Sequence, residues 1–174
     1  LTTFTEKAAL ELRDRLNQFA RKLNYNGPLH LLKVGTIHSL CNEYISKFLS
    51  YTTLKKGYQV LDDLTQFFFL YDNFDDIVIS HKDKYLGKSK KKWEAIRELI
   101  QYFNKITEEL INHTQLESSN KEFLRDIGIY YEKYCEKLFE KNRVDFPHLQ
   151  KIFFELLCNK DLYPKIKQSI KYVM

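Results

Sequence analysis

The feature that most constrains the fold is a run of apolar residues between positions 93 and 111 that repeats every three or four residues. Because an α-helix turns once in about 3.6 residues, this spacing puts all of them on one face and predicts an amphipathic helix of about five turns. We expect that face to lie in the core. Its members are Trp93, Ile96, Ile100, Phe103, Ile106, Leu110 and Ile111.

A second long helix is expected to follow and to pack antiparallel to the first. Ser119 and Glu122 have the spacing of a capping box, in which each side chain bonds the other residue's backbone N–H, so the helix should begin there. Two facing apolar stripes of this length favour a mainly α-helical fold. The expected core face of this helix is Phe123, Ile127, Tyr131, Tyr134 and Leu138.

The first 50 residues predict a strand, a turn and a helix, followed by a second helix. Residues 1–5 read as the end of an apolar strand, Thr5 is a good N-cap, and the helix should stop at the Gly-Pro pair within residues 24–28. Residues 31–34 then lead through Gly35 and Thr36 into a helix that reaches about Leu49. The apolar stripe of the first helix is Ala8, Ala9, Leu12, Leu16, Phe19, Ala20 and Leu23.

After residue 50 every expected element is a helix until the last few residues. Asp62 and Asp63 can cap a helix that runs to about Tyr71, and the run Phe-Phe-Phe-Leu at 67–70 is apolar enough to predict burial of the whole run. The other expected elements are an acidic turn at 72–76, helices at about 146–158 and 161–169, and a strand that begins at 171.

Charge and composition exclude some classes of protein. Lys and Arg number 28 against 23 Asp and Glu, and this net charge of +5 is compatible with a nucleic-acid partner without requiring one. No apolar run approaches the roughly 20 residues that cross a bilayer, and the first residues lack the pattern of a signal peptide, so we expect no membrane partner. Cys41, Cys135 and Cys158 fit no disulfide framework and are expected to be reduced, buried thiols.

The sequence offers no nucleotide-binding loop and no zinc site. Residues 87–89, Gly-Lys-Ser, imitate the end of a P-loop, but the glycine required at position 82 is replaced by lysine. His38 with Cys41, and His148 with Asp145, each lie one helical turn apart, yet neither pair has a second pair to complete the four ligands that zinc prefers. We therefore expect no metal, no cofactor and no catalytic residue in this chain.

A longer motif lies at residues 3–15, Thr-Phe-Thr-Glu-Lys-Ala-Ala-Leu-Glu-Leu-Arg-Asp-Arg. Taken alone, it predicts a strand residue that faces a core (Phe4), a helix cap (Thr5) and a solvated lysine (Lys7). The stretch also closely resembles the motif Thr-Phe-Thr-x-Lys-Ala-Ala-x-Glu-[Leu/Met]-x-x-Arg of UvrD/Rep-type superfamily 1 helicases. In that family the motif lies at the carboxyl end of a core strand and faces the DNA.

Two further motifs resemble the same family and occur in its order. Residues 35–41, Gly-Thr-Ile-His-Ser-Leu-Cys, resemble its Thr-[Phe/Ile]-His-[Ser/Gly]-[Phe/Leu/Met]-Cys motif, and residues 144–149, Val-Asp-Phe-Pro-His-Leu, resemble its Asp-Phe-x-Asp-Leu stretch. His148 departs from the pattern, because the family usually has an aspartate there that caps a helix or bonds in the core. Residues 170–174 resemble the strand before the Asp-Glu Walker B motif, so the resemblance covers the whole chain.

The resemblance implies a mainly α fold in which a multi-helix subdomain is inserted between short strands of an incomplete RecA-like α/β core of the P-loop NTPase family. Residues 1–50 would belong to the core, residues 51–142 to helical subdomain 1B, and residues 143–174 to the return into the core before Walker B. We expect both ends of the chain to lie inside a larger protein, with Walker A before Leu1. ATP and Mg²⁺ would then be cofactors of the parent protein alone.

For function, the resemblance implies part of an ATP-dependent DNA helicase that moves 3′-to-5′ on single-stranded DNA and unwinds duplexes in repair, replication or recombination. Partners would be single-stranded DNA, the duplex junction and the remaining helicase subdomains, in the cytoplasm at the nucleoid. An exposed aromatic can stack on bases, while hydroxyls and helix N-termini suit phosphates. The expected DNA-binding residues are Thr3, Phe4, Thr5, Lys7, Thr36, His38 and Ser39, with Lys88, Lys90, Lys91 and Lys92 as a possible further surface.

Two alternatives stay open. A nuclease-helicase subunit of the RecB/AddA kind shares these motifs and would differ only in sequence outside this chain. A helical protein-interaction module with no nucleic-acid role would explain the helices, but it leaves the three ordered motifs to coincidence. The lysine-rich segment is compatible with either reading, because such segments are often simply solvated.

Overall fold

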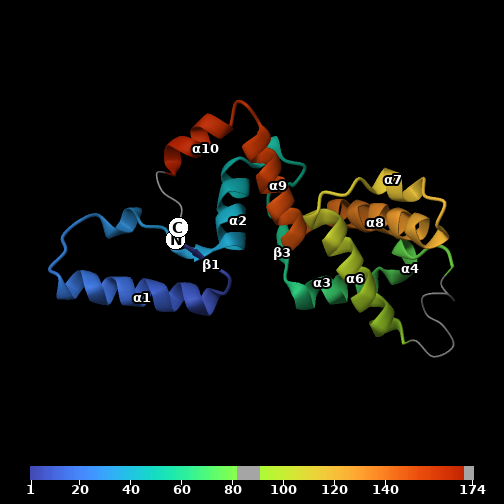
Figure 1. Ribbon diagram of the computed structural model, residues 1–174, viewed down its shortest axis with the longest axis horizontal. Helices are drawn as coiled ribbons and strands as arrows, with labels where there is room; N and C mark the ends of the chain where they lie inside the picture. Colours follow the sequence, from blue (N-terminus) through green and yellow to red (C-terminus); the bar gives the residue numbers. More distant parts are fainter. Residues whose placement is uncertain (82–90, 171–174) are drawn as a thin grey trace. The chain divides into compact units, whose positions relative to one another are not determined.

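The computed structural model describes residues 1–81 and 91–170, where the chain is mainly helical with a few short strands (Figure 1). It divides into unit 1, which comprises Leu1–Phe48 and Phe153–Met174, and unit 2, Leu49–Ile152. Lys88, Lys90 and the strand expected from position 171 lie outside the described residues. Within the described ranges, no helix combines the length and apolar character needed to cross a membrane.

Unit 1 contains two strand–helix units and a C-terminal helix pair. Strand β1 runs directly toward α1, and β2 runs into α2 (Figure 1). The two strands form a parallel pair with Thr2 opposite Gly35 and Thr3 opposite Thr36. The bounds are β1 Thr2–Thr3, α1 Glu6–Lys22, a 3-10 turn at Leu29–Leu31, β2 Gly35–Thr36, α2 Ile37–Lys47, α9 Phe146–Cys158, whose second half belongs to this unit, and α10 Tyr163–Ser169.

The core of unit 1 forms where α2 meets the end of α9 and α10. The ring of Tyr44 lies 5.5 Å from that of Phe153, and its hydroxyl lies 2.7 Å from Ser169 Oγ. The stripe of α1 contributes less than its length suggests, since Ala9 and Ala20 are buried whereas Phe19 is exposed. Other buried apolar residues here are Cys41, Ile45, Leu156, Leu162 and Ile166.

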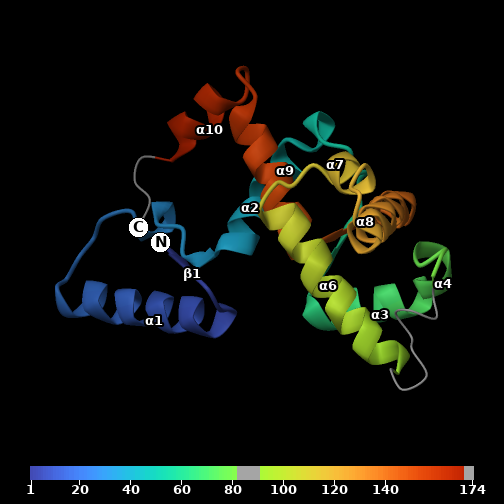
Figure 2. The same ribbon diagram turned by 45° about the vertical axis from the view of Figure 1, so that its right-hand side comes forward.

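Unit 2 is a helical cluster. The long helices α6 and α8, predicted from their stripes, supply most of its core, and α7 lies along α8 in both views (Figures 1 and 2). The bounds are a 3-10 turn at Leu49–Tyr51, β3 Gln59–Leu61, α3 Asp63–Asp72, α4 Phe74–Ile77, α6 Lys92–Glu108, α7 His113–Glu117, α8 Glu122–Glu140 and β4 Arg143–Asp145, followed by the first half of α9.

A parallel pair of strands within unit 2 was not predicted. Strand β3 pairs with β4, with Gln59 opposite Arg143 and Leu61 opposite Asp145. Three-residue strands carry too short an alternation of apolar and polar residues to be recognised in sequence. The expectation of helices alone after residue 50 was therefore wrong, as was the acidic turn at 72–76, because α4 already begins at Phe74.

Five local expectations were also wrong. Helix α8 starts at Glu122 without a side-chain cap, and Ser119 Oγ instead accepts a bond from the Lys121 backbone N–H. Phe68 is exposed because successive helical residues point about 100° apart, so a four-residue run cannot all face the core. Trp93 and Phe123, each in the first turn of its helix, are exposed too, and so is Cys158.

Candidate nucleic-acid interface

The parallel pairing of β1 with β2 brings two helix N-termini to one edge. Parallel strands end at the same side of a sheet, and here α1 follows β1 after two residues while α2 follows β2 at once. The first N–H groups of each helix have no partner inside the helix, and the helix dipole gives that end a partial positive charge. Such an edge suits phosphate groups.

The link between β1 and α1 presents Phe4 to solvent. Its side chain is 92% exposed, although an apolar ring of this size is normally buried. Thr3 Oγ1 donates to the Thr5 carbonyl at 3.0 Å, and Thr5 Oγ1 accepts from the Ala8 N–H at 3.2 Å. The residue is therefore held between two hydrogen-bonded neighbours, and the reading of Phe4 as a strand residue that faces a core was wrong.

Thr36 forms hydrogen bonds with the first turns of both α1 and α2. Its side chain is buried, and its Oγ1 accepts from the Ser39 N–H at 3.1 Å while donating to Glu6 Oε1 at 2.9 Å. Ser39 is exposed, and its Oγ donates to the Thr36 carbonyl at 2.8 Å. In this structure the Thr36 hydroxyl thus serves the fold, and Glu6, which no sequence signal singled out, fixes the first turn of α1 beside α2.

Gly35 lies directly beneath the Ser39 side chain. A Cβ atom at this position would lie 2.6 Å from Ser39 Oγ, closer than atoms pack without a shift. A larger residue at position 35 would therefore require the Ser39 hydroxyl to move. Two other predicted site residues lie near these helix starts: His38 is half-buried in the first turn of α2, and Lys7 is exposed in the first turn of α1.

Thr36→Val is expected to lower the free energy of unfolding by about 1–2 kcal/mol, because it removes an N-cap and leaves Glu6 without its hydroxyl donor. Urea unfolding followed by circular dichroism measures the change. Thr36→Ser is the matched control, since it keeps the hydroxyl and should lose less than half as much. An equal loss in both variants would mean that the hydroxyl contributes no more to stability than the methyl group does, and would contradict its assignment as the stabilising group.

Comparison with known proteins identifies the family of this chain. The family model of the UvrD/REP helicase N-terminal domain matches residues 1–174. The chain belongs to this family. The ATP-dependent DNA helicase SRS2 of Saccharomyces cerevisiae is 26% identical to it over 187 residues, which cover 100% of this chain and 15% of SRS2. The chain thus spans about 15% of the length of that relative.

In this UvrD/REP helicase N-terminal domain, His148, which stands where the family usually has aspartate, forms an ion pair with Asp145 in the core of unit 2. His148 Nδ1 lies 2.7 Å from Asp145 Oδ1, which also accepts from the His148 backbone N–H at 2.8 Å. The other carboxylate oxygen, Oδ2, accepts from Tyr134 Oη at 2.6 Å and from Gln66 Nε2 at 3.1 Å. Asp145 is therefore a helix cap and a core acceptor at once.

The ion pair shifts the titration of both partners. The nearby Asp145 carboxylate raises the pKa of His148 to about 10 against the opposing effect of burial, and the imidazolium in turn lowers the pKa of Asp145. His148 Nε2 lies 3.3 Å from Tyr131 Oη and 3.4 Å from Cys135 Sγ. The histidine is thus a structural cation in unit 2, with 14% of its side chain exposed against 1% for Asp145.

Of the expected lysine surface, Lys91 and Lys92 are described. Lys91 is exposed just before α6, and Lys92 Nζ lies 4.4 Å from the centre of the Tyr71 ring and 5.2 Å from that of Phe74. The charged end of Lys92 thus lies against two aromatic rings of unit 2 in cation–π contacts. The guanidinium of Arg97 lies over Trp93 in the same way, at 4.8 Å.

Proposed function

We propose that this chain is the DNA-contacting part of an ATP-dependent DNA helicase, with single-stranded DNA lying across the edge formed by the starts of α1 and α2. The observation that carries the proposal is Phe4, an exposed ring held next to two helix N-termini. A ring stacks on any base, and N–H groups with hydroxyls bind any phosphate, so this combination suits strand binding without sequence preference.

In the proposed arrangement each candidate residue has one role. Phe4 stacks on a base, and Lys7 adds a positive charge beside the phosphate path. Thr3, Thr5 and Ser39 offer hydroxyls that remain able to accept or donate further bonds, and His38 contacts a phosphate or base edge. Thr36 acts through the position of α2, because its own hydroxyl is already committed to Ser39 and Glu6.

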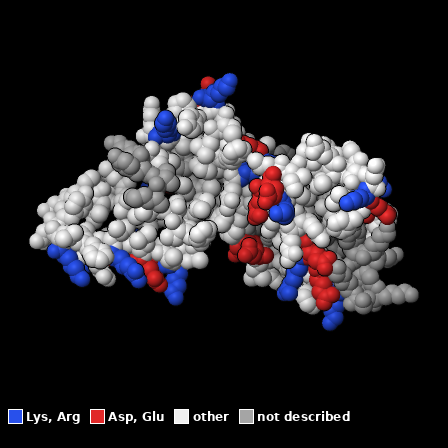
Figure 3. Space-filling view, viewed as in Figure 1, with Lys and Arg blue, Asp and Glu red and all other residues white. Residues whose placement is uncertain are grey.

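Charge along α1 supports the proposal. The helix carries five basic residues against three acidic ones, and Figure 3 shows more Lys and Arg than Asp and Glu along it on the face drawn. Over unit 2 the two signs are interspersed in the same view (Figure 3). A local excess of positive charge favours nucleic acid, and the release of counterions makes such binding weaken as salt rises.

The proposal extends to the parent protein. There, residues 51–142 form a helical subdomain inserted into a RecA-like core made by residues 1–50, 143–174 and further sequence, and that core binds ATP with Mg²⁺. Translocation is 3′-to-5′, and the Lys88–Lys92 region contacts the duplex ahead. The family membership and the likeness to the DNA helicase SRS2 support this reading. The same two findings favour a helicase over a helical protein-interaction module.

Fluorescence anisotropy with a labelled oligo(dT) strand tests the proposal. We expect saturable binding to the chain at low salt, similar affinity for a strand of mixed sequence, and a marked loss of affinity as salt rises. A full-length parent should show ATP hydrolysis that single-stranded DNA stimulates. The proposal would be overturned if the chain showed no saturable binding at low salt and the parent hydrolysed ATP at the same rate with and without DNA.

A further inference from the structure

Helices α7 and α8 approach each other unusually closely because α8 has a glycine at the contact. A Cβ atom on Gly128 would lie 2.9 Å from Glu117 Cγ, 3.0 Å from the Glu117 backbone nitrogen and 3.1 Å from the His113 carbonyl oxygen. Any other residue at this position would push α7 away. The close approach sets the side chains of α7 directly against those one turn farther along α8.

Three side chains with metal-binding atoms meet at this contact. His113 and Glu117 are one turn apart on α7, and Glu132 is one turn after Gly128 on α8. One nitrogen or oxygen atom from each of the three lies within 4.8 Å of the other two. His113 and Glu117 are half-buried and Glu132 is exposed, so an ion could enter from solvent.

An independent observation at the same place points to a ligand. The Oε1 atom of Glu117 is buried and has no hydrogen-bond partner among the residues that the structure describes. A buried carboxylate oxygen without a donor is costly, and a second carboxylate nearby makes it more so. Lys133, the cation next to Glu132 in sequence, forms its ion pair with Glu136 at 2.7 Å.

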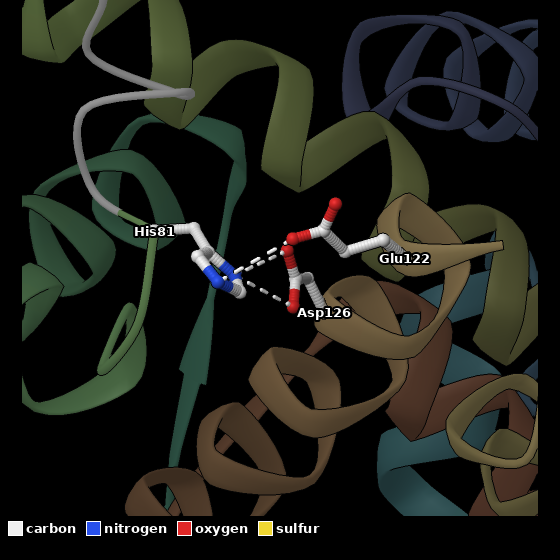
Figure 4. Close-up of side chains that lie close together, drawn as sticks. All are labelled: His81, Glu122 and Asp126. Atoms are coloured by element: carbon white, nitrogen blue, oxygen red, sulfur yellow. Dashed lines mark hydrogen bonds and ion pairs between the residues drawn. The ribbon is translucent and has the colours of Figure 1, made fainter.

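A second cluster, His81 with Glu122 and Asp126, shows the contrast (Figure 4). There the two ring nitrogens face the carboxylates, with His81 Nδ1 3.0 Å from Asp126 Oδ2 and Nε2 3.4 Å from Glu122 Oε1. The histidine ring thus contacts both carboxylates, as the dashed lines in Figure 4 show. The side chains of this cluster are therefore paired with one another, whereas the cluster at Glu117 contains an oxygen that has no donor among the described residues.

We propose that His113, Glu117 and Glu132 bind a divalent transition-metal ion of the Zn²⁺ class, with water in the remaining positions. One imidazole and two carboxylates suit zinc and its first-row neighbours, while Mg²⁺ and Ca²⁺ prefer ligands that are all oxygen. The ion would supply the partner that Glu117 Oε1 lacks and would fasten α7 to α8. Its role is structural and does not depend on DNA binding.

Titration of the whole chain with Zn²⁺ by calorimetry, and with Co²⁺ by visible absorption, tests the site. We expect one ion per chain, and a melting temperature that rises with Zn²⁺ but not with Mg²⁺. Glu132→Gln should weaken Zn²⁺ binding by about 100-fold or more and abolish the rise in melting temperature. Because Glu132 is exposed, this variant should fold normally without metal.

Two control variants make the outcome decisive. Glu136→Gln removes an exposed carboxylate from the same helix and should leave Zn²⁺ binding unchanged, and His81→Ala should also leave it unchanged. Loss of binding in His81→Ala but not in Glu132→Gln would move the ion to the other cluster and overturn the proposal. A thiolate-to-cobalt charge-transfer band, or no binding of either ion, would overturn it as well.

Discussion

Asp145→Asn is expected to lower the free energy of unfolding of unit 2 by about 3–5 kcal/mol, the usual cost of removing one partner from a buried ion pair. The carboxylate accepts bonds from Tyr134, Gln66 and the backbone and side chain of His148. An asparagine NH₂ group would face donors where the carboxylate offered an acceptor. The imidazolium of His148 would also lose its counter-charge.

Urea unfolding followed by tyrosine fluorescence and circular dichroism measures this effect. Asp161→Asn makes the same chemical change at an exposed position and should alter stability by less than about 0.5 kcal/mol. His148→Gln can keep a neutral hydrogen bond to Asp145 and should cost less than the loss of Asp145. If Asp145→Asn unfolds at the same urea concentration as the unmutated chain, the ion pair contributes little to stability and the assignment of Asp145 as a helix cap and core acceptor is wrong.

The same pair predicts a dependence of stability on pH. The pKa of His148 is about 10 in the folded chain against 6.5 for an ordinary histidine, so between these values the folded state holds a proton that the unfolded state has lost. Its contribution is complete below pH 6.5 and disappears as the pH rises toward 10. The slope approaches about 1.4 kcal/mol per pH unit within that window.

Comparison with His148→Gln isolates this contribution, because Tyr131, Tyr134 and Cys135 lie near the histidine and remain in the variant. The difference in unfolding free energy between the two chains should shrink as the pH rises through the window. On the acid side the sign is opposite. The lowered pKa of Asp145 means that its contribution is present above its ordinary value of 3.8 and is lost as the pH falls through the folded value.

Phe4→Ala is expected to weaken binding of single-stranded DNA by about 5- to 150-fold, which corresponds to about 1–3 kcal/mol for one stacked base. The exposed side chain makes little contact with the fold, so the variant should keep its stability. A loss of affinity would then report on the DNA contact alone. Anisotropy with the oligo(dT) strand, at a single low salt concentration, measures it.

Phe19→Ala is the matched control, because it deletes the same ring from an exposed position near the other end of α1. Its affinity should stay within about twofold of the parent chain, whereas Phe4→Trp should restore or strengthen binding because indole stacks at least as well. Equal losses from Phe4→Ala and Phe19→Ala would indicate non-specific adhesion of apolar surface. No loss from Phe4→Ala would remove that ring from the proposed DNA path.

Features that depend on neighbouring residues were predictable from the sequence. The caps at Thr5 and Asp62 were confirmed, as were the extent of α9 and the helix after Thr36, because each is set by residues within one or two turns. The family was recognised from three ordered motifs, which the match over residues 1–174 confirms. The DNA-binding residues remain predictions that rest on that resemblance.

Features that depend on distant residues were not predictable. Asp145 and His148 were recognised as neighbours one turn apart, but their partners Gln66 and Tyr134 come from other helices, so the pair looked like an incomplete metal site. The bond from Thr36 to Glu6 and the glycine at 128 are equally non-local. A single sequence shows which residues can cap or pack, and the fold decides which distant groups they meet.

The position of β4 near the end of unit 2 has a consequence for the order in which that unit can form. Synthesis proceeds from the N-terminus, so α3 and α8 are synthesised before Asp145 and His148 exist. Until then Gln66 and Tyr134 have no carboxylate to bond, and β3 has no strand to pair with. Joining segments so far apart in sequence also requires closing a long loop, which slows folding. Final packing of unit 2 therefore waits for its last few residues, and a nascent chain that pauses before them stays incompletely ordered.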